Sequence, residues 1–339
     1  MACFIIAEAG VNHNGSPELA LQLVDAAAAA GADAVKFQTF RTDQVITRGT
    51  EKAEYQKTHT GNGDQYDMIR ALELDEAAHE RIAERCVHRG IEFMSTPFDE
   101  WATDLLLRLG MRRIKIASGE LTHRPFIEQL ARRGLPLILS TGMASMEEVR
   151  RSVDWLRTCH TANDQPDWLT VLHCTSNYPA LPGDVNLRAM QSLAHELRVP
   201  VGYSDHTLGI EVSLAAVALG ATVIEKHFTL DRSLPGPDHQ ASLDPAQLRE
   251  LVRATRAVES ALGDGIKQPT TSELPVRALV RRSAFTRRAL PANSPINADN
   301  VSFLRPGDGI GPEHWEELQV RQTARALPAG HRLTWQDLG

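Results

Sequence analysis

The sequence predicts a parallel α/β protein: a (β/α)8 TIM barrel followed by a small C-terminal domain. Short apolar runs alternate eight times with longer amphipathic runs, and this strict alternation indicates a parallel sheet. The apolar runs are continuous rather than alternating, which is typical of strands buried on both faces. Eight such units within about 260 residues fit a closed barrel. No GxGxxG follows the first strand, which speaks against an open dinucleotide-binding sheet.

The units can be assigned in order along the chain. The expected strands are FIIAEAG, AVKFQTF, EFMSTP, RRIKIASG, PLILSTG, LTVLHC, PVGYSDH and TVIEKHF. The expected helices are SPELALQLVDAAAAAG, DEAAHERIAERCVHRG, DEWATDLLLRLG, HRPFIEQLARRG, SMEEVRRSVDWLRTCH, NLRAMQSLAHELR, LGIEVSLAAVALG and DPAQLRELVRATRAVESALG. Their apolar residues recur with the period of 3.6 that predicts an amphipathic helix.

Helix ends carry recognisable signals. Good N-cap residues stand at Asp75, Asp99, Ser145 and Asp244, and Pro245 occupies the favoured first helical position. Several helices stop at glycine, the residue that most easily ends a helix in a left-handed conformation. These stops are expected at Gly31, Gly90, Gly110, Gly134, Gly220 and Gly263.

Two segments interrupt the alternation. Residues 41–64 form a long polar excursion after the second strand, which is expected either as a lid over the C-terminal mouth of the barrel or as a solvated loop. From Gly263 a stretch rich in glycine, proline and threonine indicates a linker. The expected organisation is a catalytic barrel over 1–263, a linker over 264–280 and a small domain over 281–339. A domain this small buries little apolar surface, so support from the barrel is expected.

Composition narrows the class of function. The chain has 339 residues, a formal charge of −7 and a pI near 6.0, which gives no general attraction to nucleic acid. No apolar stretch approaches the ~20 residues that a membrane span needs, and MACFIIAEAG has no basic region typical of a signal peptide. The four cysteines are scattered, which favours buried reduced thiols and a cytoplasmic location.

Polar and charged residues gather at the ends of the expected strands. Barrels keep their active sites at the C-terminal ends of the strands, and buried charges need partners, a ligand or water. So many such ends in one barrel indicate an active site rather than isolated structural ion pairs. The residues concerned are Glu8, Lys36, Gln38, Ser95, Thr96, Lys115, Ser118, Glu120, Ser140, His173, Ser176, Tyr178, Ser204, Asp205, His206, Glu225, Lys226 and His227.

The residue types point to a metal and an anionic substrate. His206 and His227 end neighbouring strands about 4.8 Å apart, so two imidazoles can converge on a divalent ion. Lys36 and Lys115, with serine hydroxyls at the same rim, suit a phosphorylated or otherwise anionic small molecule. Glu120 is a candidate general acid or base.

Taken together, these motifs resemble the sialic acid synthase family. IAEAGVNHNG, AVKFQTF, IKIASGEL, ILSTGMA, HCTSNYPA, GYSDHT, EKHFTLD and LPGPDH occur in family order, and RRSAFTRRAL with VSFLRPGDGIGP resembles its C-terminal antifreeze-like (SAF) domain. The resemblance implies condensation of phosphoenolpyruvate with an N-acetylmannosamine-type sugar to a nine-carbon 2-keto acid and phosphate. It also implies Mn²⁺ or Mg²⁺ as cofactor and a domain-swapped homodimer.

The resemblance also implies a role for each site residue. His206 and His227 would hold the metal. Asp205, from its place beside His206 rather than from the resemblance, is expected to orient the imidazole or a water. Glu120 and Glu8 would handle protons, and Arg305 would reach the sugar in the partner subunit. Phosphoenolpyruvate would be bound by Lys36, Lys115, Ser118, Ser140, Ser176 and Ser204, and the sugar by Gln38, Tyr178, Asp238 and Arg305. Some family members have asparagine where this chain has Ser176, which puts that one contact in question.

Alternatives remain at three levels. The acceptor is expected to be N-acetylmannosamine, giving N-acetylneuraminate, or 2,4-diacetamido-2,4,6-trideoxymannose, giving N,N'-diacetyllegionaminate. GYSDHTLGIEV and LPGPDHQASLDP favour the second slightly. A related synthase acting on a phosphorylated aldose is disfavoured because only one phosphate-like cluster is evident. A non-catalytic carbohydrate-binding protein is a remote alternative, since an inert barrel would not be expected to keep every charged strand end.

Overall fold

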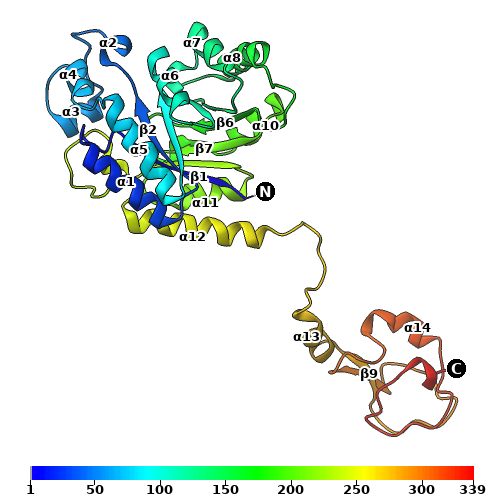
Figure 1. Ribbon diagram of the computed structural model, residues 1–339. Coiled ribbons are helices and arrows are strands. Elements are labelled where there is room, and N and C mark those ends of the chain that lie inside the picture. The colour runs from blue at the N-terminus through cyan, green and yellow to red at the C-terminus, as the bar shows by residue number, and fades with distance from the viewer. Residues whose placement is uncertain (1) are drawn as a thin grey trace. The chain divides into compact units, whose positions relative to one another are not determined.

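The computed structural model describes residues 2–339, which fall into two compact units. The first unit ends at Gly263 and the second spans Asp264–Gly339 (Figure 1). Each unit is described by itself.

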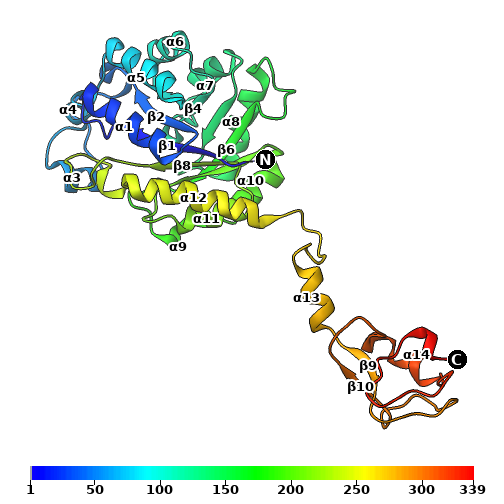
Figure 2. The same cartoon turned by 60° about the horizontal axis from the view of Figure 1, so that its bottom comes forward.

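The first unit is an eight-stranded parallel barrel, as the sequence predicts. The hydrogen-bonded order is β3-β2-β1-β8-β7-β6-β5-β4, and β3 and β4 lie next to each other where the ring is completed. Figure 2 shows the strands surrounded by the helices that connect them. The strands are β1 Phe4–Gly10, β2 Ala34–Thr39, β3 Glu92–Pro97, β4 Ile114–Ile116, β5 Leu137–Ser140, β6 Leu169–Cys174, β7 Val201–Asp205 and β8 Val223–His227.

One principal helix follows each strand, and the four predicted N-caps are confirmed, as are the glycine stops at Gly31, Gly90 and Gly263. The helices expected to stop at Gly110, Gly134 and Gly220 end slightly earlier, with Leu109, Arg132 and Leu219 as their C-caps. Asp99 and Asp244 accept from backbone N–H groups of the first turn, and Gly31 ends its helix at a φ of 83°. The principal helices are α1 Pro17–Ala30, α5 Glu76–Arg89, α6 Glu100–Arg108, α7 Arg124–Ala131, α8 Met146–Cys159, α10 Ala189–Leu197, α11 Glu211–Ala218 and α12 Pro245–Leu262, with the short α9 Pro182–Val185 before α10.

The excursion after β2 is more ordered than a solvated loop. It contains α2 Thr42–Val45, α3 Glu54–Thr60 and α4 Gln65–Arg70. Asp64 caps α4 by accepting from the N–H of Tyr66, whose side chain is buried. Lys52 is also buried and donates to Thr60 Oγ1 at 3.0 Å. Local capping and these internal bonds therefore give the polar segment a defined structure (Figure 1).

The core of the barrel has two layers. The larger layer lies between strands and helices and includes Leu23, Ile82, Leu106, Val171 and Leu251. The smaller layer fills the interior of the barrel below the strand ends, and it consists of Ile6, Ala34, Met94, Ile138, Leu172 and Val223. Because apolar side chains fill the interior, polar groups can point inward only near the mouth.

The second unit has a small core of its own. Its strands β9 Ser283–Thr286 and β10 Val301–Leu304 pair antiparallel, and α14 Trp315–Gln319 follows. The buried residues are Ala284, Ile296, Val301, Ile310, Leu318, Leu327, Leu333 and Leu338. The expected linker differs from the structure at its end, where Glu273–Val280 forms α13. Glu273 stabilises this start by accepting from the N–H of Thr270 at 2.8 Å.

Within residues 2–339, no helix combines the length and the apolar character that crossing a membrane requires.

Candidate active site

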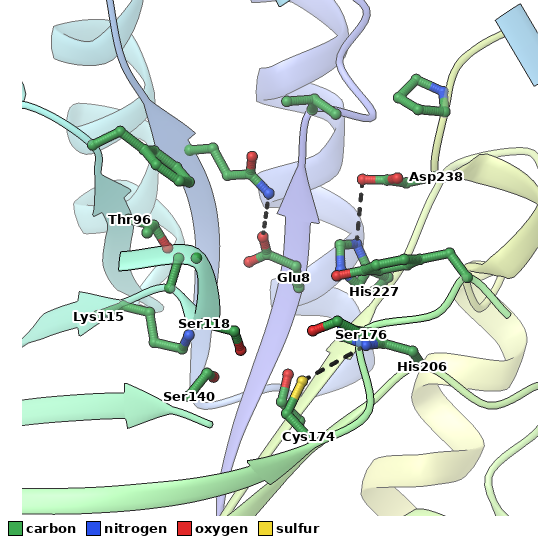
Figure 3. A pocket seen from close by; sticks show the side chains of 18 of the residues that line it. Glu8, Thr96, Lys115, Ser118, Ser140, Cys174, Ser176, His206, His227 and Asp238 are labelled. Atoms are coloured by element: carbon green, nitrogen blue, oxygen red, sulfur yellow. Dashed lines mark hydrogen bonds and ion pairs between the residues drawn. The ribbon is translucent and has the colours of Figure 1, made fainter. Parts of the chain in front are cut away.

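A cavity of about 470 Å³ opens at the C-terminal ends of the barrel strands. Twelve of the fourteen site residues predicted from the sequence line it. Figure 3 shows Lys115, Ser118 and Ser140 on one side, Glu8 in the middle, and His206, His227 and Asp238 on the other. The lining residues among those predicted are Glu8, Lys36, Gln38, Lys115, Ser118, Ser140, Ser176, Tyr178, Ser204, His206, His227 and Asp238.

Strand register brings the inward-facing groups together. Glu8 on β1 lies opposite both Lys36 on β2 and His227 on β8. Ser204 on β7 lies opposite Glu225 on β8. Residues paired in register on neighbouring strands point to the same face of the sheet, and so do residues two apart on one strand. Glu8, Lys36, Ser204, Glu225 and His227 therefore project into the cavity as one cluster.

Buried ion pairs join this cluster. Lys36 Nζ lies 2.5 Å from Glu8 Oε2 and 3.7 Å from Glu225 Oε2. Lys115 Nζ lies 3.7 Å from Glu225 Oε1, and Ser204 Oγ donates to the same oxygen at 3.0 Å. Glu225 therefore connects both lysines, and it is the central acceptor of the cluster.

The protonation equilibria follow from burial and these charges. Burial raises the pKa of Glu8 to about 7, although the Lys36 charge opposes the shift. Burial also acts to raise the pKa of Glu225, but Lys115 and Lys36 outweigh it and the net shift is downward. Burial lowers the pKa of Lys115, whereas for Lys36 the charges of Glu225 and Glu8 overcome burial and raise the pKa. Glu8 is thus the carboxyl that can carry a proton near neutral pH.

Hydroxyl groups complete the same side of the cavity. Ser140 Oγ is buried, and within residues 2–339 no hydrogen bond satisfies it. Ser118 Oγ accepts from the N–H of Gly142 at 2.9 Å. A Cβ at Gly142 would come within 2.1 Å of Ser176 Oγ and 3.0 Å of Ser118 Oγ. The glycine therefore lets the two serines approach closely, and the unsatisfied hydroxyl of Ser140 indicates space for a polar ligand.

The two histidines differ in how readily they can bind a metal: burial acts to lower the pKa of His206, but Cys174 and the carbonyl of Thr175 outweigh it and raise the pKa, so this ring must give up a proton to become a ligand. The ring centroids of the two histidines are 5.4 Å apart. The Nδ1–H of His206 donates to the carbonyl of Thr175 at 2.8 Å, which leaves Nε2 of the neutral ring with its lone pair. Burial lowers the pKa of His227 well below its usual value, so this ring is neutral, and its Nδ1 is buried without a hydrogen bond among the described residues. The pair therefore fits a divalent ion with open positions.

Other side chains frame the histidines. Tyr178 lies against His206, with ring centroids 4.1 Å apart. Asp238 Oδ2 is 3.9 Å from His227 Nδ1, and burial raises the pKa of Asp238 to about 6. No group of three or more His, Cys, Asp or Glu in the part of the chain described here could hold a metal ion. Water or substrate atoms would have to complete the coordination of an ion held by the two histidines.

Two predicted site residues do not line this cavity. Glu120 lies in a short 3-10 turn, Ser118–Glu120, and its Oε2 is 2.8 Å from His123 Nδ1. The turn directs the carboxyl away from the strand end, because the residue is no longer in extended backbone. Arg305 belongs to the second unit and is exposed there.

Asp205 was expected beside the imidazole of His206, but its side chain lies on the outer face of the barrel wall. Its register partner on β8 is Lys226, and the two side chains form a buried ion pair of 2.9 Å on the outer face of the barrel wall. Asp205 also accepts from Thr207 N at 2.8 Å and from Ser213 Oγ at 2.6 Å. Because strand side chains alternate, Ser204 and His206 point inward while Asp205 points toward α11. Asp205 therefore positions the loop after β7, and it does not contact the imidazole.

Sequence reasoning gave no specific role to several cavity residues. Glu225 was recognised only as a strand end, although its position two residues before His227 places it on the same face. Thr96, which accepts from Lys36 Nζ at 3.0 Å, and Cys174 also line the cavity. Val45, Met68 and Ile69 line it from the segment after β2 and carry no recognisable motif.

Comparison with known proteins agrees with this geometry. The NeuB family model matches residues 23–267, and the SAF domain model matches residues 281–339. N,N'-diacetyllegionaminic acid synthase of Legionella pneumophila is 52% identical over 339 residues, covering 100% of this chain and 95% of the relative. The Campylobacter jejuni protein of that name is 45% identical, covering 93% of each chain.

A solved structure is similar as well. N-acetylneuraminic acid (sialic acid) synthetase from Leptospira borgpetersenii superposes with a TM-score of 0.71 at 36% identity, covering 81% of this chain and 90% of that one. The family match spans most of the barrel, and the curated relatives cover nearly the whole chain. The chain belongs to the NeuB family of nonulosonic acid synthases and carries a C-terminal SAF domain.

Proposed function

We propose that this enzyme is an N,N'-diacetyllegionaminic acid synthase, which condenses phosphoenolpyruvate with 2,4-diacetamido-2,4,6-trideoxymannose and releases phosphate. The observation that carries the chemistry is the buried cluster of two lysines and unsatisfied polar groups facing a histidine pair in one cavity. The choice of sugar is supported by the 52% identity to the Legionella pneumophila synthase.

The alternative product, N-acetylneuraminate, has weaker support. The sialic acid synthetase of known structure is 36% identical, against 52% and 45% for the two legionaminic acid synthases. The first expectation from the sequence therefore gives way to the second. Both reactions form the same carbon–carbon bond, so the site chemistry is unchanged.

Phosphoenolpyruvate binds at the lysine and serine side of the cavity in this proposal. Lys36 and Lys115 neutralise its phosphate and carboxylate charges, and Ser118, Ser140 and Ser176 donate to its oxygens. Ser204 would have to turn its hydroxyl from Glu225 to donate as well. The unsatisfied hydroxyl of Ser140 supports this placement, because a bound anion would supply the missing partner.

A divalent ion, Mn²⁺ or Mg²⁺, fits between His206 and His227. When bound, it supplies Lewis acid chemistry that polarises the sugar aldehyde. Thr175 holds His206 in the required tautomer, and Tyr178 packs against the same ring. Gln38, which donates to Glu8 Oε1 at 3.3 Å, and Asp238, whose Oδ2 lies 3.9 Å from His227 Nδ1, both line the cavity and are placed to bind the sugar.

Proton transfer falls to the carboxyl groups that line the cavity. The enol carbon of phosphoenolpyruvate attacks the aldehyde carbon of the sugar. The aldehyde oxygen then takes a proton, which Glu8 can supply because the pKa of Glu8 is about 7. Positive charge then develops at C2 of phosphoenolpyruvate, where the Glu225 carboxylate stabilises it and accepts a proton from the incoming water. As the tetrahedral intermediate collapses, the C2 hydroxyl gives its proton to the departing phosphate oxygen, the C2–O bond to phosphate breaks, and the phosphate leaves toward Lys36 and Lys115. Glu120 would need to leave His123 to take part.

The direct test measures phosphate release from phosphoenolpyruvate with Mn²⁺. One reaction contains 2,4-diacetamido-2,4,6-trideoxymannose, a second contains N-acetylmannosamine, and each has an EDTA control. We expect EDTA-sensitive turnover in both and a higher kcat/KM for the diacetamido sugar. Higher kcat/KM for N-acetylmannosamine would refute the sugar assignment, and no release with either sugar by folded, metal-loaded protein would refute the reaction.

In this proposal the small domain of each chain contributes to the active site of the partner chain. The barrel over 1–263 is the catalytic domain, 264–280 joins it to the SAF domain over 281–339, and the enzyme is a domain-swapped homodimer in which Arg305 reaches the partner's sugar. A cytoplasmic location is supported by the cysteines Cys3, Cys86, Cys159 and Cys174, all of which are free.

A mixed dimer tests this arrangement. Arg305→Ala and Glu225→Gln chains are expected to be nearly inactive alone. When the two are co-expressed, a swapped dimer regains activity, because one site combines an intact Glu225 with Arg305 of the other chain. A mixture as inactive as its components, with mixed dimers verified by mass, would contradict the swap.

A further inference from the structure

One wall of the cavity is apolar and comes from the segment that follows β2. Val45, Met68, Ile69 and Leu72, which we name the apolar wall, line the cavity together with Val11, Phe40 and Phe98. Phe40 and Phe98 pack edge to face, and Val11, Phe40 and Leu72 form a small buried cluster with Ile69 and Phe98 against it. This wall therefore has a fixed apolar backing.

The front of the apolar wall is left open to the cavity. Val45 is 38% exposed, and Met68 and Ile69 are partly exposed. Apolar side chains that line a cavity without being covered gain free energy when a ligand removes them from water. The wall is thus shaped for an apolar group of the substrate.

The polar residues of the segment are engaged elsewhere. Arg48 lies over the ring of Tyr66, whose hydroxyl donates to Asp43 at 2.5 Å, and none of these three lines the cavity. Gln56 does line it, but its amide oxygen accepts from Ala53 N at 3.0 Å. A hydroxyl group brought against the apolar wall would therefore meet few partners.

The reaction fixes which end of the sugar meets this wall. The aldehyde, C1, must lie beside phosphoenolpyruvate and the histidine pair, both at the strand ends. The other end of a six-carbon sugar then points away from the polar cluster, toward the segment that covers the mouth. In both views that segment, with α3 and α4, lies beside the end of the barrel where β1 ends (Figures 1 and 2).

We propose that the apolar wall contacts carbon 6 of the acceptor sugar and favours a methyl group over a hydroxymethyl group at that position. The inference rests on the proposed function and deepens it, because it names the feature by which this site prefers a 6-deoxy sugar. A methyl group buries the exposed faces of Val45 and Ile69, whereas a hydroxyl at the same place loses its water without a full replacement. Discrimination of this kind amounts to roughly 10–100-fold in kcat/KM.

The test uses two acceptors that differ only at carbon 6: N-acetylmannosamine and its 6-deoxy analogue. For the wild-type enzyme we expect kcat/KM to favour the 6-deoxy sugar by about tenfold or more. The variant Val45→Thr, Ile69→Thr adds two hydroxyl groups to the wall; Val45→Thr keeps the side-chain volume, whereas Ile69→Thr also removes one terminal carbon, a loss that the Ile46→Thr control shares. It is expected to bring the ratio close to one while the KM for phosphoenolpyruvate stays within about twofold of wild type, since the polar cluster is untouched.

The matched control is Ile46→Thr. Ile46 is adjacent to Val45, is also β-branched and partly exposed, but does not line the cavity, so the wild-type ratio should persist. A wild-type ratio near one, or an unchanged ratio in the double variant with normal thermal unfolding, would overturn the inference and leave the synthase reaction standing. Absence of phosphate release with every acceptor would overturn both.

Discussion

Two sets of buried charge lie back to back on β7 and β8. Facing inward, Glu225 contacts Lys36 and Lys115 at 3.7 Å each, and nearby Ser140 Oγ has no hydrogen bond within residues 2–339. Facing outward, Asp205 and Lys226 are each 1% exposed and are fully engaged with each other, Thr207 and Ser213. The outward pair is complete by itself, whereas the inward cluster combines one close ion pair, Lys36–Glu8 at 2.5 Å, with the two long contacts of Glu225 and with unused polar groups.

This difference separates charge kept for the fold from charge kept for a ligand. A buried ion pair whose remaining bonds are satisfied is costly to break, because one charge is left alone. A cluster with an unsatisfied hydroxyl and long ion pairs sacrifices stability until a ligand completes it. Substitutions in the inward cluster should therefore lower activity with little change in the free energy of unfolding. Substitutions in the outward pair should mainly lower the free energy of unfolding.

The largest effect is expected from Glu225→Gln. Loss of this carboxylate should lower kcat/KM by on the order of 10³-fold, because both lysines lose their shared partner and C2 loses its stabilising charge. Stability should change little, since the Glu225 charge helps to raise the pKa of Glu8, and Glu8 can ionise once it is gone. Phosphate release and urea unfolding check this. Near-normal kcat/KM would remove Glu225 from the mechanism.

Asp205→Ala should show the reverse pattern. It leaves the Lys226 ammonium buried without its carboxylate, which is expected to cost about 3–5 kcal/mol of unfolding free energy. The variant Asp205→Leu, Lys226→Met should recover most of that loss, because an apolar pair replaces the ion pair. Urea unfolding measures both. If Asp205→Ala unfolds like wild type, the pair has no structural role.

The raised pKa of Glu8 predicts how stability and activity depend on pH. Its folded pKa of about 7 lies above the ordinary value of 4.5, so the folded state binds the extra proton and stability falls as pH rises from about 4.5 to 7. If protonated Glu8 is the acid, kcat/KM should also fall about tenfold per pH unit above 7. Glu8→Gln should flatten the stability profile and remove this limb of the rate profile. An unchanged stability profile would place the titration elsewhere.

The smallest effects are expected from Ser140→Ala and Ser152→Ala, two variants that each remove one buried hydroxyl group. Ser140 Oγ is buried without a partner, whereas Ser152 Oγ is buried in α8 and donates to the carbonyl of Leu121 at 2.6 Å. Ser140→Ala should raise the KM for phosphoenolpyruvate about tenfold with no loss of stability. Ser152→Ala should cost about 1 kcal/mol of stability and leave KM unchanged. Equal behaviour of the two variants would contradict the comparison.

Much of this architecture could be predicted from the sequence. Continuous apolar runs and helix caps predict the barrel, and the strand ends predict Lys36, Lys115, His206 and His227 in one cavity. Periodicity alone does not say which residue of a strand faces inward, so Asp205 was expected beside His206 although it points to α11. Register across β7 and β8 decides this, and register depends on the closed sheet.

Other features depend on contacts that no local pattern reveals. Glu120 leaves the cavity because the chain turns at Ser118–Glu120 and offers it His123. The apolar wall is formed by single side chains of α2 and α4 and by Leu72, just after α4, which come together only in the folded segment. The sequence of this segment is polar overall, so its composition concealed the few apolar residues that face the cavity.

Calorimetric titration of phosphoenolpyruvate into the wild-type, Ser140→Ala and Ser152→Ala enzymes tests the central claim most directly, because it needs neither acceptor nor turnover. If the inward cluster is kept for an anionic ligand, wild type binds one phosphoenolpyruvate per chain, Ser152→Ala binds it equally well, and Ser140→Ala binds it about tenfold more weakly. Folded wild-type protein that binds no phosphoenolpyruvate, or equal affinity in all three proteins, would contradict the account.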